Sequence, residues 1–547
     1  MWEEMKGLPG AKASASAGFL STLHRLRSTG HESRLGDVFE EFGLSANVPL
    51  SFVEVGLQKK HPILRVRDFI TTLDSKGKLD LLLCGNTPAT YLKFWDTYRK
   101  TAPEHPVFGK NRKDLSLSVP VWLHADEGTG PKRRPVMVVQ YQPLLGKGTS
   151  RGGQGLNYVG NSLTTRFLFS IMAARLYSGP LKKNRPLLKL VHEFALDMGS
   201  CYDEPISLPM TPEFEKITLV PLGLKGDLVA LNKLGGLTRN FQRDTWSNED
   251  GPGICHLCSA GQLGHAWHDV SYENMLSMRQ DSELPWESTP SLIAELPVDP
   301  GNMPGFFRLD VFHIMHKGLL GDVAANTIAA CYDCDLFAQS SYVKHLDFVY
   351  WDLQQFCTQN KLDLHMNALT KGQLGMNKAS DYPSASLGND TTSLCVYLEA
   401  KLKDVFPTIS ACDRDYFFNM LACLENGNKL MRLMYHSKLW LSKAERSSMI
   451  VHFRNLLTAF VSCAQHAYNR QMCRFKLQPK YHCAGEILFG LEHDHKWGKP
   501  SLNPISSAVQ MDEDYIGRIC AICRSVSSRR LHTKTLKNYL LALAAHW

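Results

Sequence analysis

The sequence has 547 residues, of which 44% are hydrophobic and 21% are charged. This composition is ordinary for a globular protein and argues against a disordered or fibrous chain, and the length leaves room for two to four structural units. The net charge of +8 is a mild excess that is compatible with a polyanionic partner. Because many proteins without such a partner carry as much charge, the excess alone does not select a nucleic-acid function.

The N-terminal sequence and the scattered cysteines indicate that the thiols are reduced. The acidic start, Met-Trp-Glu-Glu-Met, argues against a secretory signal. The most apolar stretches, residues 166–177 and 456–467, are too short or too polar to span a bilayer, which needs about 20 apolar residues. The fifteen cysteines are scattered along the chain, so we expect reduced thiols and one metal site in place of a disulfide framework.

In chain order, residues 1–30 begin with a Gly/Ala/Ser-rich stretch that predicts loose order, and residues 33–108 have a mostly helical pattern. Runs rich in β-branched and apolar residues then predict three strands, and apolar residues at helical spacing predict one helix before a fourth strand. The predicted strands are residues 119–125, 136–141, 166–172 and 216–222, and the predicted helix is residues 186–198.

An aspartate stands at the end of the first and of the fourth predicted strand. The first strand runs into Asp126, and the fourth runs out at Asp227. This order is similar to that of an RNase H-like fold, in which the two strands are neighbours and two such acids meet at one edge. Carboxylates aimed at a common point favour divalent cations, and two Mg²⁺ ions can act together on a phosphodiester. The alternative is that each aspartate only opens a turn.

Two cysteines and two histidines have the spacing of a zinc site. Cys255 and Cys258 form a C-x-x-C pair in a turn-rich segment, and His313 and His316 lie three residues apart on a predicted helix. Two thiolates and two imidazoles complete a tetrahedral zinc shell, with Asp310 as a rival ligand or an orienting group. The alternative is ordinary packing, which we also predict for the Cys331/Cys334 and Cys520/Cys523 pairs.

Three segments resemble the transposases of the CACTA-like and related DDE-type cut-and-paste families. They are residues 123–128 with the strand that follows, residues 224–228 with the cysteine pair downstream, and the D-x-x-H element of residues 308–313. The resemblance covers roughly residues 110–400. It implies an α/β protein with an RNase H-like mixed sheet core, interrupted by a large, mainly helical insertion.

The resemblance also implies a third acid on a helix beyond the insertion. Asp390 is the first candidate, because it begins a predicted helix, and Glu399 is the second. The alternative for Asp390 is a helix cap, worth about 1 kcal/mol. The predicted division is a mostly helical N-terminal region at 1–112, the first part of the core at 113–255, the insertion with the zinc site at 256–375, the final core helix at 376–404 and a C-terminal helical region at 405–547.

Basic residues lie in the loops around the predicted acids. Such residues make sequence-independent phosphate contacts, although a solvated surface explains them equally well. The candidates for DNA contact are Lys132, Arg133, Arg134, Lys147 and Arg151, with further basic runs at residues 182–185 and 524–534.

By this resemblance the chain cleaves DNA at transposon ends and joins the freed 3′ hydroxyl to target DNA, with two Mg²⁺ or Mn²⁺ ions held by Asp126, Asp227 and Asp390. His124 and Glu127 flank the first acid and are expected to orient it or the substrate. The partners implied are double-stranded DNA and further copies of the chain, with no membrane, and the location implied by the substrate is the nucleus, otherwise the cytoplasm. The sequence ahead of the predicted core has no recognisable zinc-finger motif, so recognition of specific DNA ends is not accounted for.

Two alternatives stay open. One is a transposase-derived protein that binds DNA without cutting it, which is favoured if Asp390 and Glu399 both lie far from Asp126 and Asp227. The other is a stand-alone RNase H-like nuclease, against which the cysteine pair and the D-x-x-H element argue, because a simple nuclease needs no insertion.

Overall fold

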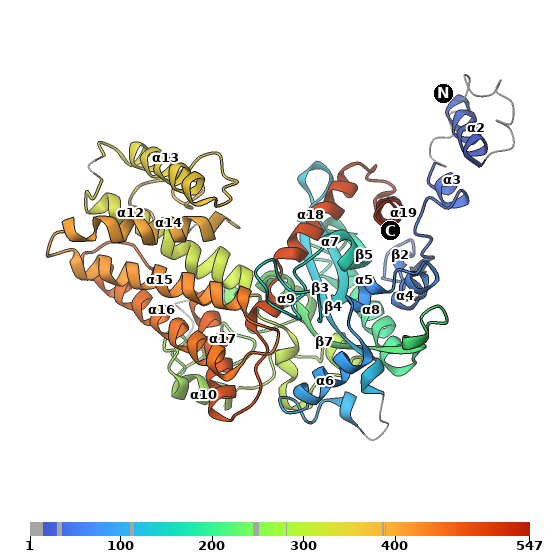
Figure 1. The fold of residues 1–547 in the computed structure, drawn as a ribbon, viewed down its shortest axis with the longest axis horizontal. Helices are drawn as coiled ribbons and strands as arrows, with labels where there is room; N and C mark the ends of the chain where they lie inside the picture. The colour runs from blue at the N-terminus through green and yellow to red at the C-terminus, as the bar shows by residue number, and fades with distance from the viewer. Residues whose placement is uncertain are drawn as a thin grey trace.

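The computed structural model describes residues 15–29, 35–109, 114–243, 251–280, 282–337, 339–384, 388 and 390–547. It is a mixed α/β protein in which a sheet part and a helical part lie side by side (Figure 1). Of the predicted loose start, residues 1–14 lie outside the described residues, and the next residues form helix α2 (Ala15–Ser28), followed by α3 (Leu35–Glu41). No helix among the described ranges is long and apolar enough to cross a membrane.

The sheet part is built on five strands in the order β5-β4-β3-β7-β6. Strands β3 (Ser118–Thr129), β4 (Pro135–Pro143) and β5 (Phe167–Ala173) are antiparallel neighbours, and β7 (Lys216–Lys225) runs parallel to β3. The short strand β6 (Ile206–Ser207) pairs antiparallel with β7. The four predicted strands and the predicted helix, which is α8 (Arg185–Asp203), are therefore confirmed.

Strand β3 is the centre of the sheet and is buried from Ser118 to Asp126. Continuous burial means that both faces of the strand are covered, which is why the sequence here is a nearly unbroken apolar run and does not alternate. Helix α8 packs against β7, while helices α18 (Gln510–Arg524) and α19 (Leu531–Ala544) pack against β3 and β5.

The N-terminal region is mostly helical, as predicted, and includes one small hairpin. Strands β1 (Leu50–Val53) and β2 (His61–Leu64) pair antiparallel, and β2 lies against β5. Trp95 in one of the helices donates its indole N–H to the carbonyl of Ser118 (2.8 Å), which ties this region to the start of β3. The helices here are α4 (Val66–Ser75), α5 (Asp80–Leu83) and α6 (Pro88–Tyr98).

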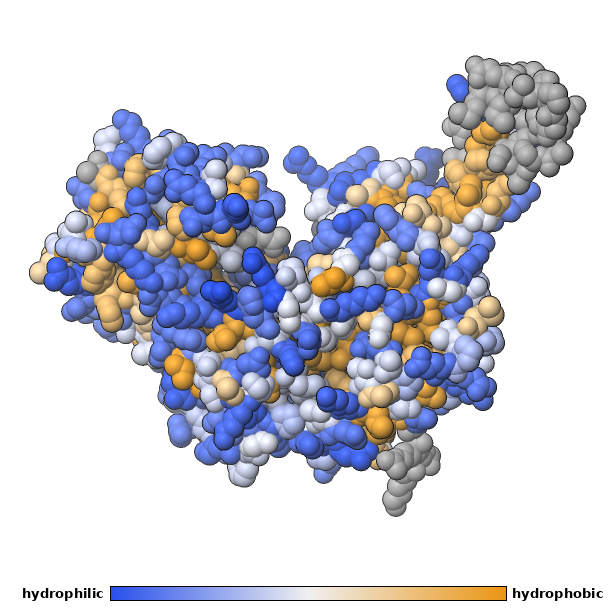
Figure 2. All heavy atoms as spheres, viewed as in Figure 1, coloured by the Kyte–Doolittle hydropathy of each residue, from blue (hydrophilic) through white to orange (hydrophobic). Residues whose placement is uncertain are grey.

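The helical part is a bundle of long helices in which α15 packs against α12, α14 and α16, and α16 packs against α17. Hydrophilic side chains cover much of its visible face, and the surface is notched between it and the sheet part (Figure 2). Its helices are α10 (Tyr272–Gln280), α12 (Leu320–Asp333), α13 (Tyr342–Asn360), α14 (Asp390–Val405), α15 (Arg414–His436), α16 (Lys443–Asn469) and α17 (Pro479–Lys496). Shorter helices elsewhere are α7 (Ser162–Thr165), α9 (Leu228–Gly235) and α11 (Ser291–Ala294).

The return of the chain from the helical part to the sheet differs from the prediction. We expected residues 376–404 to supply the last core helix, but α14 packs among α12, α13 and α15. The segment that returns to the sheet is α18, about 120 residues further along the chain, and it crosses β3. The helical insertion is therefore longer than the sequence pattern indicated.

Candidate functional site

Asp126 and Asp227 leave two neighbouring parallel strands at the same level. The register of β3 and β7 ends with His124 opposite Lys225, and each aspartate follows two residues later. Gly226 permits the approach, because a Cβ atom there would lie 2.9 Å from the carbonyl oxygen of Ala125. Asp227 caps helix α9 by accepting from the N–H of Ala230 (2.6 Å), so its predicted turn-opening role is real and coexists with its place beside Asp126.

A third carboxylate comes from a helix that the sequence prediction did not consider. Glu513 lies in the first turn of α18. Burial, together with the negative charges of Asp227 and Glu513, holds the pKa of Asp126 well above its usual range. Asp126 therefore lies within electrostatic range of both of the other carboxylates. We refer to Asp126, Asp227 and Glu513 as the acid edge.

The two acids proposed for the third position lie in the helical part. Asp390 begins α14, and its carboxylate accepts hydrogen bonds from the backbone N–H groups of His365 and Met366 (2.8 and 2.9 Å). Glu399, two turns on, pairs with Lys403 (2.7 Å). Helix α14 lies in the helical part (Figure 1), and the carboxylates that raise the pKa of Asp126 are those of Asp227 and Glu513. Glu513 therefore stands where we predicted Asp390. Asp390 instead fastens the preceding loop to its helix.

A buried ion pair fixes helix α18 on the sheet. Asp512, next to Glu513, accepts from the ammonium of Lys225 (3.0 Å), and Gln140 bridges Asp512 and the Nδ1 atom of His124 (3.1 and 2.8 Å). Burial would raise the pKa of Asp512, but the positive charge of Lys225 outweighs it and lowers that pKa to about 2. His124, which we expected to orient Asp126 or the substrate, is therefore part of the buried hydrogen-bond network that holds helix α18 on the sheet.

The packing of helix α18 over β3 explains why the Asp-Glu-Gly sequence has a glycine at residue 128. A Cβ atom at this position would lie 2.4 Å from Ile516 and 2.5 Å from the sulfur of Cys520. Helix α18 can cross β3 only because this residue has no side chain. Cys520 and Cys523 are buried where α18 packs, in agreement with the packing role predicted for that pair.

The D-x-x-H element contacts the acid edge from the side. His313 lies between Asp310, which binds its Nδ1 atom, and Glu513, whose carboxylate is 3.2 Å from its Nε2 atom. Burial would lower the pKa of His313, but these two hydrogen bonds raise it to about 9, so the ring is charged at neutral pH. Asp310 also accepts from the N–H of Val509 (3.1 Å) at the start of α18.

Glu127 points to a different set of partners. Its carboxylate accepts from the hydroxyl of Tyr177 (2.6 Å) and from the ammonium of Lys233 (2.7 Å) on α9. This residue therefore links β3 to the helix that Asp227 caps.

The predicted zinc ligands are divided between two places. Among the described residues, one group of three or more His, Cys, Asp and Glu side chains has ligand atoms within 4.8 Å of one another: Cys255, Cys258, His482 and Glu486. We call this group the cysteine cluster. His313 is occupied by Asp310 and Glu513, and His316 lies 3.3 Å from the hydroxyl of Thr392. The cysteines thus meet a histidine and a glutamate of α17 in place of His313 and His316.

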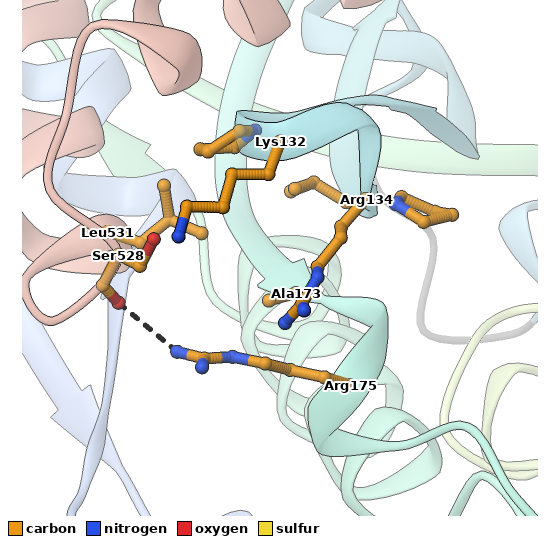
Figure 3. A pocket seen from close by; sticks show the side chains of 9 residues that line it. Lys132, Arg134, Ala173, Arg175, Ser528 and Leu531 are labelled. Carbon is orange, nitrogen blue, oxygen red and sulfur yellow. Dashed lines mark hydrogen bonds between the residues drawn. The ribbon is translucent and has the colours of Figure 1, made fainter.

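The basic residues of the β3–β4 turn surround a cavity of about 150 Å³. Lys132 and Arg134 lie around it with Arg175, which donates to the carbonyl of Ser528 (3.2 Å; Figure 3). Arg133 and Arg151 are exposed, whereas Lys147 is paired with Asp80 (2.8 Å). The cavity lies beyond the end of the strand that carries Asp126, and three of its nine lining residues are basic.

Two segments that supply residues of the candidate sites were not predicted from the sequence, although both carry a recognisable pattern. Asp512-Glu513-Asp514 is an acidic run at the start of an amphipathic segment, and His482-x-x-x-Glu486 places two ligand types on one helix face. Both segments lie far along the chain from their partners, and only the tertiary fold brings them together.

Comparison with models of known protein families found no match. Comparison with curated proteins found no similar sequence either. The functional assignment therefore depends on the geometry described above.

Proposed function

We propose that this protein is a transposase-like enzyme that cleaves phosphodiester bonds of DNA and transfers the freed strand, with an RNase H-like core. The observation that carries the proposal is the meeting of Asp126, Asp227 and Glu513 from three distant segments at one end of the central strands. Carboxylates brought together against their own repulsion are a feature of sites that bind divalent cations.

The sheet topology supports the core assignment. An RNase H-like sheet has three antiparallel strands followed by a fourth that is parallel to the first and lies beside it, which is the relation among β3, β4, β5 and β7. A parallel bridge between Leu224 and Phe307 extends the sheet beyond β7 at the end that faces the D-x-x-H element. The antiparallel strand β6 is an addition to this pattern.

We propose that the acid edge binds two Mg²⁺ or Mn²⁺ ions. Carboxylate oxygens are the ligands these cations prefer, and bound cations would relieve the repulsion that raises the pKa of Asp126. Two such ions activate an attacking oxygen and stabilise a leaving oxygen at a phosphodiester. Asp126, Asp227 and Glu513 would hold them.

The surrounding side chains keep the carboxylates in position. Burial would raise the pKa of Glu513, but the hydrogen bond from His313 and the charge of Lys317 lower it to about 2, so this ligand is ionised over the physiological range. Asp512 and Lys225 anchor the same helix from below. These contacts supply the supporting residues that metal-binding carboxylates require.

The positive cavity at the β3–β4 turn supports a DNA substrate. Lys132, Arg134 and Arg175 surround it, and phosphates are the anions of a DNA backbone. Association of further copies on paired DNA ends and a nuclear location follow from the proposed reaction and belong to the same proposal.

The proposal is tested by nicking of supercoiled DNA with the purified full chain in Mg²⁺ or Mn²⁺. Asp126→Asn, Asp227→Asn and Glu513→Gln should each lower the nicking rate at least about 10³-fold. Asp390→Asn and Glu399→Gln are matched controls in which the rate should stay within about threefold.

Two results would overturn the proposed reaction. An equal loss of nicking rate in Asp390→Asn and Glu513→Gln would show that the acid edge is not the site of cleavage. DNA binding by the wild type without metal-dependent cutting would support a transposase-derived binding protein. In that protein Glu513 would stay paired with His313 and Lys317 and would bind no metal ion.

A further inference from the structure

The cysteine cluster has the dimensions of an occupied tetrahedral site. The sulfur of Cys258 lies 3.2 Å from Nε2 of His482, and Oε1 of Glu486 lies 3.4 Å from that nitrogen. The sulfur of Cys255 lies 3.5 Å from the same carboxylate oxygen. A tetrahedral zinc ion with bonds of about 2.0–2.3 Å sets its ligand atoms about 3.3–3.8 Å apart. Three of the six ligand–ligand distances are therefore close to those that one ion would set, and the other three are no longer than 4.8 Å.

The histidine presents the correct nitrogen to the cluster. Nδ1 of His482 lies 3.0 Å from the carbonyl oxygen of Trp267, which can only accept a hydrogen bond. Nδ1 must therefore carry the proton, and the lone pair of a neutral ring is on Nε2, which faces the two sulfurs. A hydrogen bond to a carbonyl through the other nitrogen is the usual support of a metal-bound imidazole.

The charges balance around a divalent ion. Two thiolates and one carboxylate around such an ion leave one negative charge, and the side chains of all four ligands are buried. Arg279 of α10 supplies the positive charge, with its Nε atom donating to Oε2 of Glu486 (3.0 Å). Without an ion, the same buried space would hold two thiols against an imidazole and a carboxylate, an expensive arrangement for groups removed from water.

We propose that Cys255, Cys258, His482 and Glu486 bind one structural Zn²⁺ ion. Thiolate ligands select zinc over Mg²⁺ or Mn²⁺, and the four protein ligands leave no open position, which is the arrangement of a structural site. The backbone N–H of Leu257 lies 3.4 Å from the sulfur of Cys255 and stabilises the thiolate. His256, between the two cysteines, is turned away and bonds the carbonyl of Phe307 (2.8 Å).

The ion fastens the segment after α9 to helix α17. The two segments share a small separate core of seven buried residues, which is little apolar surface for independent stability: Ile254, Cys255, Cys258, Ala260, Met275, Met278 and Phe489. Gly485, between the two ligands of α17, allows close packing, since a Cβ atom there would lie 2.5 Å from Val270. Helices α10 and α17 lie together at one end of the helical part (Figure 1).

The site is tested on the full chain by zinc content and by Co²⁺ replacement. The wild type should contain one zinc per chain, and its Co²⁺ form should show the ligand-field and thiolate charge-transfer bands of tetrahedral cobalt. Cys255→Ser with Cys258→Ser should abolish both signals. The matched control is Cys331→Ser with Cys334→Ser, a second C-x-x-C pair in which metal content should stay at one per chain.

The outcome does not depend on the proposed reaction, because Asp126→Asn should keep its zinc whether or not the wild type cuts DNA. A folded wild-type chain that stays free of metal after exposure to Zn²⁺ would overturn the proposal, as would undiminished zinc in the Cys255/Cys258 variant. If that variant does not fold, the Co²⁺ spectrum of the Cys331/Cys334 variant decides: thiolate-bound tetrahedral cobalt supports the site, and cobalt without thiolate bands contradicts it.

Discussion

The acid edge and the cysteine cluster both join segments that are far apart in sequence, but they are held together in different ways. Helix α18 is fixed by contacts beneath and beside its carboxylate, namely the Asp512–Lys225 ion pair and the contact of His313 with Glu513. The cysteine cluster has few outside contacts, chiefly Arg279 on Glu486 and the Trp267 carbonyl on His482.

If both metal proposals hold, this difference separates a preformed site from one that an ion completes. The acid edge keeps its geometry through protein contacts, so loss of Mg²⁺ or Mn²⁺ should remove the chemistry and leave the fold. In our proposal the cysteine cluster depends on a zinc ion for cohesion, so loss of zinc should loosen the structure around it. The predictions below test this contrast, beginning with the largest expected effect.

Removal of zinc should open the region around the cysteine cluster. A structural zinc ion contributes up to about 10–16 kcal/mol in small zinc-binding peptides. With a high-affinity zinc chelator, amide hydrogen exchange in residues 251–280 and in α17 should therefore accelerate at least about 10³-fold. Withdrawal of Mg²⁺ alone should change exchange in β3 and α18 by less than about tenfold. Equal protection with and without zinc would contradict the contrast.

Loss of the Asp512 carboxylate should destabilise the sheet part. Asp512→Ala leaves Lys225 buried without its partner, and breaking a buried ion pair in this way costs about 3–5 kcal/mol. The measurement is the free energy of unfolding of this part in denaturant. Arg518→Ala removes a half-exposed charge of the same helix and should change stability by less than about 1 kcal/mol. Similar losses in the two variants would show that α18 is not anchored by this pair.

Replacement of His313 should weaken catalysis without abolishing it. His313→Gln removes the charged ring that positions Glu513, and loss of such a supporting contact lowers metal affinity or activity about 10–100-fold. The nicking rate should fall by this factor, with recovery at higher Mn²⁺. His365→Gln is the matched control, because His365 makes the corresponding contact with Asp390 and the rate should not change. A larger loss in the control would point back to Asp390.

The smallest expected effect is a gain of stability in Asp126→Asn without metal. The folded-state pKa of Asp126 is raised, so the wild type loses stability as pH increases from about 4 through that pKa, and the variant does not. At pH 8 in a chelator the variant should unfold a few °C higher, since about 1 kcal/mol shifts the unfolding temperature of a large domain by about 2–4 °C. Added Mg²⁺ should stabilise the wild type only. A variant less stable than the wild type in the chelator would show that the carboxylates do not repel.

Local sequence patterns predicted the sheet well, because each strand has its own apolar run and each ends at an acid or a turn. Asp126, Asp227 and the cysteine pair were singled out for this reason: the pattern that points to each of them lies in neighbouring residues of the chain. Asp310 and His313 were recognised as a motif, but the partner predicted for them was wrong. The pair contacts Glu513 and does not join the cysteines in a zinc site.

The missing parts all come from segments that return after the long insertion. Glu513 and the His482/Glu486 pair lie on helices whose local patterns resemble those of any amphipathic helix. Asp390 was preferred as the third acid because it begins a helix. In the structure its carboxylate accepts hydrogen bonds from the backbone of His365 and Met366, which holds the preceding loop against that helix. Which helix meets the sheet is decided by packing, such as that of Ile516 and Cys520 over Gly128, and no local pattern contains that information.

The most direct test of the account is to map the cation at the acid edge by iron-mediated cleavage of the protein backbone. Fe²⁺ replaces Mg²⁺ at oxygen ligands, and with peroxide and ascorbate it cuts the chain beside the bound ion. We predict cuts near residues 126, 227 and 513 that Mg²⁺ suppresses and that Asp126→Asn removes. Cuts near residue 390, with none near 513, would contradict the account.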